Sequence, residues 1–263
     1  KKILTMNQGG LRLKNEQKQK PLFSLITVVK NNEKFLEETI KSVLNQSFKD
    51  FEYIIIDGKS DDNTLNIIHK YEDQIDYWVS QNDEGIYDAF NKGINLCNGD
   101  YIGIINSDDV YTKDALKIVS NYISKFPSKD FIFGSVKKHW GVLHGFNPKK
   151  IYYSWVFYTS HSTGFFIKRE SAKINGIYNL KYKYHADYDY FFRMIVKNKM
   201  QGVSTSKNEI TGIFRRGGFS STISFWKLFK EELLIRIDNG QNIFLVLIIF
   251  IYKCIKNFKR FFK

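Results

Sequence analysis

Two adjacent carboxylates, Asp108 and Asp109, are the residues of this 263-residue chain whose spacing most directly suggests chemistry. Neighbouring carboxylates repel each other, so both stay ionised only where a cation neutralises them. Hard divalent cations such as Mn²⁺ or Mg²⁺ take carboxylate ligands and share phosphate oxygens with them. The pair therefore predicts a Mn²⁺ or Mg²⁺ site that would stabilise a departing phosphate. The alternative is an N-cap for a helix expected to start near Thr112.

Two further acidic positions suggest chemistry on the substrate. Asp57 follows the apolar run Ile54–Ile56, and its carboxylate could accept a nucleobase N–H or a ribose hydroxyl, or serve only as a turn acid. Asp187 opens an expected helix, where it could act as a general base on an acceptor hydroxyl or simply favour the helix dipole. Asp189 is the neighbouring alternative for the base.

Four basic or ionisable residues give weaker signals. Arg193, one and a half helical turns beyond Asp187, could pair with an acid, touch a donor substrate or be solvated. His161 precedes a Gly-Phe-Phe segment and is a weak candidate for the acceptor side, although a lone histidine is more often structural. Arg215 and Arg216 precede two glycines, which predicts either a mobile loop closing on a diphosphate or a surface turn.

Strands and helices alternate along the first half of the chain. Apolar runs predict strands at residues 22–29, 51–57, 76–80, 101–106 and 131–136. Apolar residues at helical spacing predict helices at 34–46, 65–71, 86–97 and 115–126. This order predicts an α/β fold with a mostly parallel central sheet flanked by helices, whose ligands bind beyond the carboxyl ends of the strands. Asp57 and Asp108 each follow such a strand, so we expect them at one edge.

The second half of the chain is less regular. Beyond about residue 138 we expect a mixed extension of the sheet that forms the acceptor side. Its expected parts are an aromatic run at 152–158, strands at 161–168 and 202–214, and a helix at 187–197.

The chain carries a formal net charge of +13, which suits a polyanionic partner. The location of the charge decides which partner. The apolar run Ile243–Tyr252 is too short for the ~20 residues that span a bilayer, and it precedes a basic, aromatic end, Lys253–Lys263. We therefore expect a helix lying on an anionic membrane surface, and no nucleic acid partner. A buried terminal helix with a basic tail is the alternative.

The two cysteines, Cys97 and Cys254, form neither a disulfide framework nor a metal-ligand spacing. A reducing compartment is the simpler interpretation. No signal peptide is visible, and the chain begins at Lys1 rather than Met. We expect a cytoplasmic protein, peripheral at the inner face of the cell membrane. The oligomeric state has no signal in the sequence.

Several segments, in order along the chain, resemble the inverting GT-A glycosyltransferases of family 2, especially bacterial polysaccharide and lipopolysaccharide transferases of the colanic-acid type. The matching segments are LITVVKN at 25–31, TIKSVLNQS at 39–47, EYIIIDGKSDDNT at 52–64, DEGIYDAFNKGI at 83–94, NSDD at 106–109 and the DYD segment with a later arginine at 187–193. The NSDD segment stands where the family carries its DXD motif.

The resemblance implies a metal-dependent transfer of sugar from a nucleotide-diphosphate sugar, with UDP as the expected nucleotide, to a glycan or lipid-linked acceptor. It also implies a role for each matched residue. These are Thr27, Asp57 and Asp83 at the nucleotide base, Asp108 at the ribose or diphosphate, Asp109 on the metal, Asp187 as catalytic base, and His161 and Arg193 near the acceptor and donor.

The chain departs from the family pattern at three positions. Gln81 stands where the family has a Glu before Asp83, Ala186 replaces the usual Glu before the catalytic Asp, and Asn106 replaces the first acid of DXD. A donor contact and an acceptor contact are therefore in question, and Asp108 and Asp109 are left to hold the metal.

The expected organisation has four parts. Residues 1–20 form a loose N-terminal extension, 21–138 the nucleotide-sugar-binding half, 139–222 the acceptor-binding half and 223–263 an amphipathic helical segment that associates with membrane. Two other classes share some of these features. A nicotinamide or flavin oxidoreductase shares the α/β pattern, but no Gly-x-Gly-x-x-Gly follows the first strand. A non-catalytic basic adaptor would use the charge but not the acidic strand ends.

Overall fold

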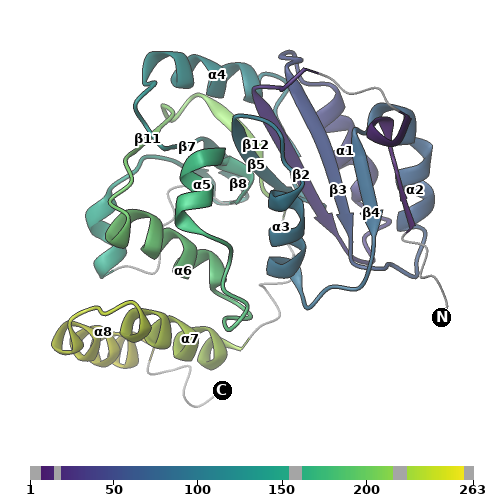
Figure 1. Cartoon of the computed structure of the whole chain (residues 1–263). Helices are drawn as coiled ribbons and strands as arrows, with labels where there is room; N and C mark the ends of the chain where they lie inside the picture. The colour runs from purple at the N-terminus through teal and green to yellow at the C-terminus, as the bar shows by residue number, and fades with distance from the viewer. Residues whose placement is uncertain (1–6, 15–18, 154–161, 216–223, 258–263) are drawn as a thin grey trace.

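The computed structural model describes residues 7–14, 19–153, 162–215 and 224–257, and this part of the chain is built around an eight-stranded sheet (Figure 1). Its strands are β1 (Asn7–Gly9), β2 (Phe23–Val29), β3 (Phe51–Asp57), β4 (Tyr77–Ser80), β5 (Tyr101–Asn106), β7 (Phe131–Phe133), β10 (Phe165–Lys168) and β11 (Gly202–Ser204). Their spatial order is β1-β4-β3-β2-β5-β10-β7-β11. The β4-β3-β2-β5 group is parallel, whereas β10 runs antiparallel to both β5 and β7. The sheet is thus parallel from β4 to β5, as expected, with antiparallel pairing at β1 and β10.

The register of the parallel strands brings their acidic ends to one edge. Asp57 stands opposite Val29 of β2 and opposite Ser80 of β4. On the other side of β2, Val28 stands opposite Asn106, the last residue of β5. Because parallel strands share the position of their carboxyl ends, the turns after β3 and β5 lie at the same edge of the sheet.

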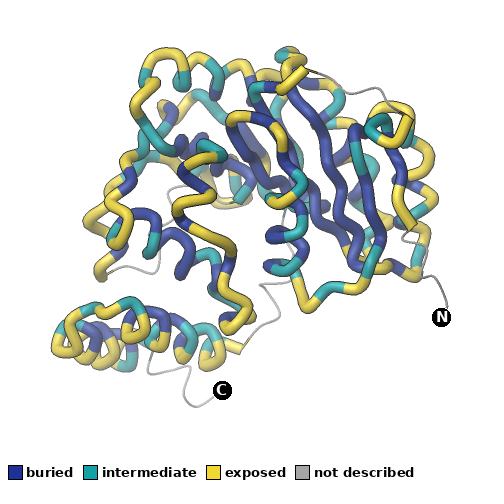
Figure 2. Tube along the Cα trace, viewed as in Figure 1, coloured by how far each residue is buried: buried dark blue, intermediate teal, exposed yellow. Residues whose placement is uncertain are grey.

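Helices cover both faces of the sheet. They are α1 (Leu36–Leu44), α2 (Thr64–Lys70), α3 (Ile86–Asn95), α4 (Ala115–Lys125), α5 (Arg169–Asn175) and α6 (Ala186–Phe192). Alternate residues of β2 belong to two separate clusters, because successive side chains of a strand point to opposite faces. Leu25 packs with residues of α1, α2 and α4, whereas Ile26 packs with residues of α3, α5 and α6. Figure 2 shows the sheet as the most deeply buried part of the chain.

A smaller four-stranded sheet adjoins the large one. It contains β6 (Val110–Tyr111), β8 (Ser135–Lys138), β9 (Gly141–Leu143) and β12 (Ile210–Ile213), in the order β6-β12-β8-β9. The sequence predicts a single strand at 131–136, but the chain changes sheets at Gly134. A Cβ at Gly134 would overlap the Thr211 side chain of β12, so only glycine permits this close approach.

The expectation of a loose N-terminal extension is wrong for residues 7–14. β1 pairs antiparallel with β4, and a 3₁₀ helix (Leu11–Lys14) follows it. Arg12 anchors this segment, since its guanidinium donates to the Leu96 carbonyl (2.8 Å) and pairs with Glu52. The segment is polar because it covers a sheet edge through its backbone, which leaves no apolar alternation to detect in the sequence.

Two helices close the described chain, α7 (Phe225–Asp238) and α8 (Ile243–Lys256). They form a hairpin, and the rings of Phe229 and Phe250 stack between them at 5.5 Å. In Figure 1 the hairpin lies beside α6, away from the parallel strands. Within the described ranges, no helix combines the length and apolar character needed to cross a bilayer.

Candidate active site

Asp57, the last residue of β3, has no exposed surface. One carboxylate oxygen accepts hydrogen bonds from the Ser60 backbone N–H (3.0 Å) and the Ser80 hydroxyl (2.6 Å), and the other accepts from the Ser60 hydroxyl (2.5 Å). A buried carboxylate needs such donors because leaving water disfavours its charged form. Asp57 thus shapes the turn after β3. Protein groups enclose the carboxylate, and the expected contact of its side chain with a nucleotide stays a prediction.

Asp83 supplies an accessible carboxylate beside that turn. It is partly exposed, and its Oδ1 accepts a hydrogen bond from the Gly85 N–H (3.1 Å). Its other oxygen lies against Gly58, the residue after Asp57, where an added Cβ would overlap it. Gly58 therefore lets the Asp83 carboxylate reach the edge of the sheet. Asp83, which the resemblance also assigns to the nucleotide base, is the accessible carboxylate at this edge.

Thr27 lies within the core of β2. Its side chain is fully buried, and its hydroxyl forms a hydrogen bond with the Tyr53 hydroxyl at 2.9 Å. The predicted contact between Thr27 and the nucleotide base is therefore corrected. The residue satisfies a buried tyrosine rather than a ligand.

The two adjacent carboxylates after β5 have different environments. Asp109 is fully buried, and its two oxygens accept hydrogen bonds from the Thr163 hydroxyl (2.5 Å) and the Arg215 backbone N–H (3.0 Å). Its backbone carbonyl accepts from the Thr39 hydroxyl at 2.7 Å. Asp109 thus joins β5 to α1 and to the chain after β12. Asp108 is partly exposed, so it is the accessible member of the pair. This geometry gives Asp109 a positioning role, and its role as a metal ligand stays a prediction.

Asp187 lies in the first turn of α6 and is partly exposed. Its Oδ1 accepts hydrogen bonds from the Tyr188 backbone N–H (2.8 Å) and from the Tyr87 hydroxyl of α3 (3.1 Å). Burial, together with the nearby Asp187 charge, raises the pKa of Tyr87 well above its ordinary value. The Tyr87 hydroxyl therefore keeps its proton and orients the Asp187 carboxylate as a donor. The Asp187 carboxylate remains accessible, as a general base that takes a proton from a bound hydroxyl must be.

Asp189 and Arg193 bind each other instead of a substrate. Asp189 is buried, and its carboxylate accepts from Arg193 Nε (2.9 Å) and from Asn239 Nδ2 (2.8 Å) of the α7–α8 connection. The other two guanidinium nitrogens of Arg193 donate to the carbonyls of Asn175 and Ile177. Pairing with an acid, one of the alternatives from the sequence, is what the structure shows. The roles of Asp189 as a base and of Arg193 as a donor contact stay predictions.

The basic residues of the expected loop are only partly described. Arg215 pairs with Glu38 of α1 at 2.5 Å and lies over the Phe35 ring at 4.5 Å. These contacts, with the Asp109 bond of its backbone, place Arg215 beside the turn after β5. Arg216 and His161 lie outside the described residues, so their predicted roles in the mobile loop and on the acceptor side remain predictions.

The predicted carboxylates fall into three pairs, each with one buried and one accessible member. The buried members are Asp57, Asp109 and Asp189, and the accessible ones are Asp83, Asp108 and Asp187. The buried carboxylates organise turns, whereas the accessible ones can meet a ligand. Two of the pairs lie at the carboxyl edge of the parallel strands, and the third is joined to α3 through Tyr87.

A comparison with known families agrees with this arrangement. The family described as "Glycosyl transferase family 2" matches residues 24–191, which include all three pairs. The chain belongs to glycosyl transferase family 2. Its membership confirms the expected family, while the finer colanic-acid subgroup remains a prediction.

Relatives and solved structures extend the similarity beyond the matched segment. This transferase is 28% identical over 246 residues to a PGL/p-HBAD biosynthesis glycosyltransferase of Mycobacterium tuberculosis, covering 87% of this chain and 90% of that one. An uncharacterized glycosyltransferase of Rickettsia typhi is 34% identical over 112 residues, covering 43% and 35%.

Two solved proteins have the same fold. Staphylococcus aureus TarS 1–349 in complex with UDP-GlcNAc superposes with a TM-score of 0.64 and 20% identity, covering 83% of this chain and 66% of that one. The mannosyltransferase PcManGT from Pyrobaculum calidifontis, in complex with GDP-Man and Mn²⁺, gives 0.63 and 14%, covering 85% and 66%. Against full-length TarS, the chain spans 39% of the solved protein. The predicted α/β GT-A fold is confirmed.

The residues of the transferase fit a divalent cation whose remaining ligands would come from the substrate. In the part of the chain that the structure describes, no group of three or more His, Cys, Asp or Glu side chains is placed to hold a metal ion. Asp108, next to the buried Asp109 charge, offers the hard oxygen ligands that Mn²⁺ and Mg²⁺ take. Such ions commonly bind through one or two carboxylates together with substrate phosphates and water, which matches this donor set.

Sequence reasoning missed the residues that hold the carboxylates in place. They are Ser60, Ser80, Tyr87, Thr163 and Glu231. Tyr87 belongs to a segment that resembles the family, so a signal existed but not its partner. Ser60 also lies in such a segment, three residues after Asp57. Ser80, Thr163 and Glu231 are ordinary hydroxyl or acidic residues far from their partners in the chain, and only the fold brings them together.

Proposed function

We propose that this family 2 glycosyltransferase moves a sugar from a nucleoside-diphosphate sugar, UDP being the preferred nucleotide, to a hydroxyl of a glycan or lipid-linked acceptor, with inversion at the anomeric carbon. The observation that carries the proposal is the placement of Asp187. It is accessible, it receives the Tyr87 hydroxyl bond at 3.1 Å, and through α3 it is joined to the edge that bears Asp83. Two proteins with the same fold were solved in complex with UDP-GlcNAc and with GDP-Man.

In the proposed reaction, Asp83 and the turn shaped by Asp57 bind the nucleoside. Asp108 holds the divalent cation, and Asp109 fixes the position of Asp108. The cation, when bound, neutralises the charge that develops on the departing diphosphate. Asp187 accepts the proton of the acceptor hydroxyl while that oxygen attacks the anomeric carbon opposite the diphosphate. One displacement of this kind inverts the configuration and needs no covalent intermediate.

Association with the inner face of the cell membrane is part of the proposal. One side of α8 is apolar and exposed, with Phe244 at 73%, Ile255 at 70% and Ile248 at 63%. A helix in the plane of the membrane buries such a side among lipid chains, and basic residues near it attract anionic headgroups. Cell-surface polysaccharide synthesis, which uses acceptors at this surface, is the pathway class that fits.

A panel of nucleotide sugars tests the activity. The protein, incubated with each sugar nucleotide and Mn²⁺ or Mg²⁺, is expected to release the nucleoside diphosphate slowly by hydrolysis, and EDTA is expected to stop the release. Chromatography of the nucleotides gives the measurement. Thermal-shift titrations with UDP plus Mn²⁺, and separately with NADH, accompany it. Stabilisation by NADH alone, with no sugar nucleotide consumed, would refute the proposal.

A further inference from the structure

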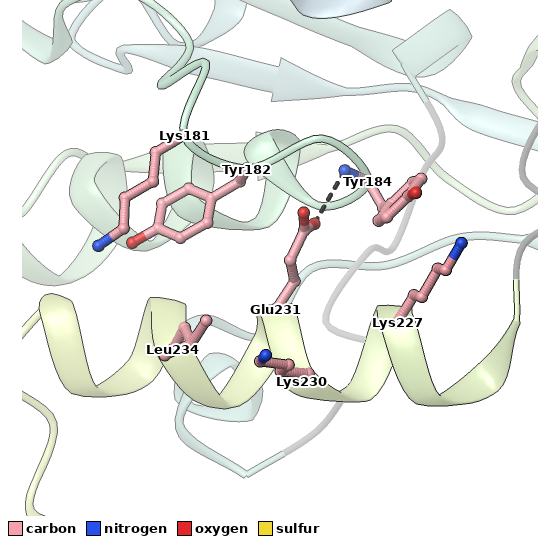
Figure 3. Close-up of a pocket in the computed structure, with 7 residues that line it drawn as sticks. All are labelled: Lys181, Tyr182, Tyr184, Lys227, Lys230, Glu231 and Leu234. Atoms are coloured by element: carbon pink, nitrogen blue, oxygen red, sulfur yellow. Dashed lines mark hydrogen bonds between the residues drawn. The ribbon is translucent and has the colours of Figure 1, made fainter.

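A pocket lies between α7 and the segment that leads into α6 (Figure 3). Its volume is about 240 Å³. Lys227, Lys230 and Leu234 line it from α7, and Tyr182 and Tyr184 line it from the facing segment. This volume suits a phosphate or diphosphate group better than a complete sugar nucleotide, because drug-sized ligands occupy cavities of ~300–1,000 Å³.

Within the described part of the chain, some charged side chains that line the pocket have hydrogen-bond or ion-pair partners, and others do not. Glu231 turns its carboxylate to the facing segment and accepts hydrogen bonds from three successive backbone N–H groups, those of residues 183–185, at 2.7–3.0 Å. Lys181 pairs with Asp238 at 2.5 Å. Lys227 and Lys230 are both exposed, and among the described residues neither has a side-chain hydrogen bond or ion-pair partner. Two ammonium groups are thus available to an anion.

The pocket is directly connected to the proposed catalytic base. The Tyr184 carbonyl accepts a hydrogen bond from the Tyr87 hydroxyl at 3.0 Å, and the same hydroxyl lies 3.1 Å from Asp187 Oδ1. Glu231 also holds the backbone of His185, two residues before Asp187. An anionic group held in the pocket would therefore place the remainder of its molecule on the acceptor side of the site.

An apolar stripe of α7 borders the pocket. Trp226, Leu234 and Ile237 are 39%, 37% and 48% exposed, and with Lys230 they are spaced three or four residues apart along one side of the helix. An acceptor with a phosphate and a hydrocarbon chain matches this juxtaposition, since its charge would meet the lysines and its chain would leave over the apolar stripe.

We propose that this pocket binds the phosphate or diphosphate of a lipid-linked acceptor, with Lys227 and Lys230 contacting the phosphate oxygens. The inference rests on the proposed function and specifies its acceptor class. The lysines place the acceptor, and its sugar hydroxyl then reaches Asp187. Anionic membrane lipids carry the same phosphate chemistry, so the test separates the two sources.

Calorimetric titration of the whole protein with geranyl diphosphate, in the presence of UDP and Mn²⁺, tests the site. Lys227→Ala/Lys230→Ala is expected to weaken the affinity by about tenfold, because each lysine supplies a charge-assisted contact. The matched control, Lys113→Ala/Lys117→Ala, removes the same charge near the start of α4, far from the pocket in Figure 1, and is expected to change the affinity less than twofold. All four lysines are exposed, so both variants should fold.

Three results would overturn the proposal. One is equal affinity for geranyl diphosphate in the double variant and the native protein. Another is geraniol binding as tightly as geranyl diphosphate, since this would leave the charge without a role. The third is a double variant that no longer binds phosphatidylglycerol vesicles but still binds geranyl diphosphate. This result would show that the lysines contact membrane headgroups. Failure of UDP and Mn²⁺ to bind would instead refute the proposed function, and it is measured in a separate titration.

Discussion

The buried carboxylates at the carboxyl edge of the sheet and in the α7–α8 hairpin have different partners. At the edge, Asp57 and Asp109 are buried and accept hydrogen bonds from hydroxyl and backbone N–H groups. In the hairpin, the buried Glu232 meets two cations, Arg236 at 2.8 Å and Lys253 at 2.5 Å. Neutral donors hold the two carboxylates at the edge, whereas two cations surround the single carboxylate in the hairpin.

The outer surfaces differ in the same sense. The turns after β3 and β5 present accessible carboxylates, whereas α8 presents apolar side chains and buries Lys253. The exposed apolar residues of α8 are Ile243, Phe244, Leu247, Ile248, Phe250, Ile251, Tyr252 and Ile255. Exposed apolar surface of this extent is costly in water and marks a binding surface. This difference supports our proposal that the edge binds a charged substrate and that the hairpin contacts a membrane.

Substitution of the proposed base, Asp187, is expected to have the largest effect. Asp187→Asn keeps the shape but removes the proton acceptor, so transfer is expected to fall by about 10²–10⁴-fold. Donor binding, which we place at the sheet edge, is expected to stay unchanged. Steady-state assays together with calorimetric titration of the donor measure the two effects. An equal loss of donor affinity would contradict the separation of base and donor site.

Removing the buried charge of the hairpin tests its internal compensation. Glu232→Gln leaves Arg236 and Lys253 without their carboxylate, so the free energy of unfolding is expected to drop by about 3–5 kcal/mol. Glu170→Gln, which breaks an exposed pair with Lys173, is the matched control, with an expected loss of at most about 1 kcal/mol. Urea denaturation followed by circular dichroism measures both. Equal losses would show that the hairpin network is no stronger than a surface pair.

Charging the α8 surface tests the apolar side of the comparison. Ile248→Glu/Ile251→Glu is expected to weaken binding to phosphatidylglycerol vesicles roughly a hundredfold, through lost apolar burial and added repulsion. Stability should change little, because both side chains are exposed. Ile174→Glu is the control, since Ile174 is 71% exposed but lies on α5. Co-sedimentation gives the measurement, and unchanged pelleting of the double variant would refute membrane association through α8.

The smallest expected effect is a change of folding stability with pH in the alkaline range. Burial lowers the pKa of Lys253 to about 8, although Glu232 opposes the shift. The unfolded chain therefore holds a proton that the folded chain has lost between about pH 8 and the ordinary lysine value of about 10.4, so this residue makes stability rise with pH in that window. The slope is at most about 1.4 kcal/mol per pH unit. Comparison with Lys253→Met isolates it, and identical pH profiles would contradict the buried state of Lys253.

Much of the fold could be predicted from the chain. The strands at 51–57 and 101–106 have the predicted bounds, because each is a mainly apolar segment that stops at turn residues. The helix expected at 187–197 is present but changes after Phe192 to a π-helix, Arg193–Lys197. Nothing in the local sequence marks that change.

The sequence alone determined the alternating pattern, the parallel strands and the family, because these depend on local runs and on ordered motifs. It also identified the carboxylates. Only the tertiary structure decided which of them a ligand can reach, because burial depends on partners distant in the chain. Ser80 encloses Asp57 across 23 residues, and Thr163 encloses Asp109 across 54. Packing likewise decided which side of α8 is exposed. Lys253 is buried in an ion pair with Glu232, whereas Ile243, Ile248, Ile251 and Ile255 are exposed.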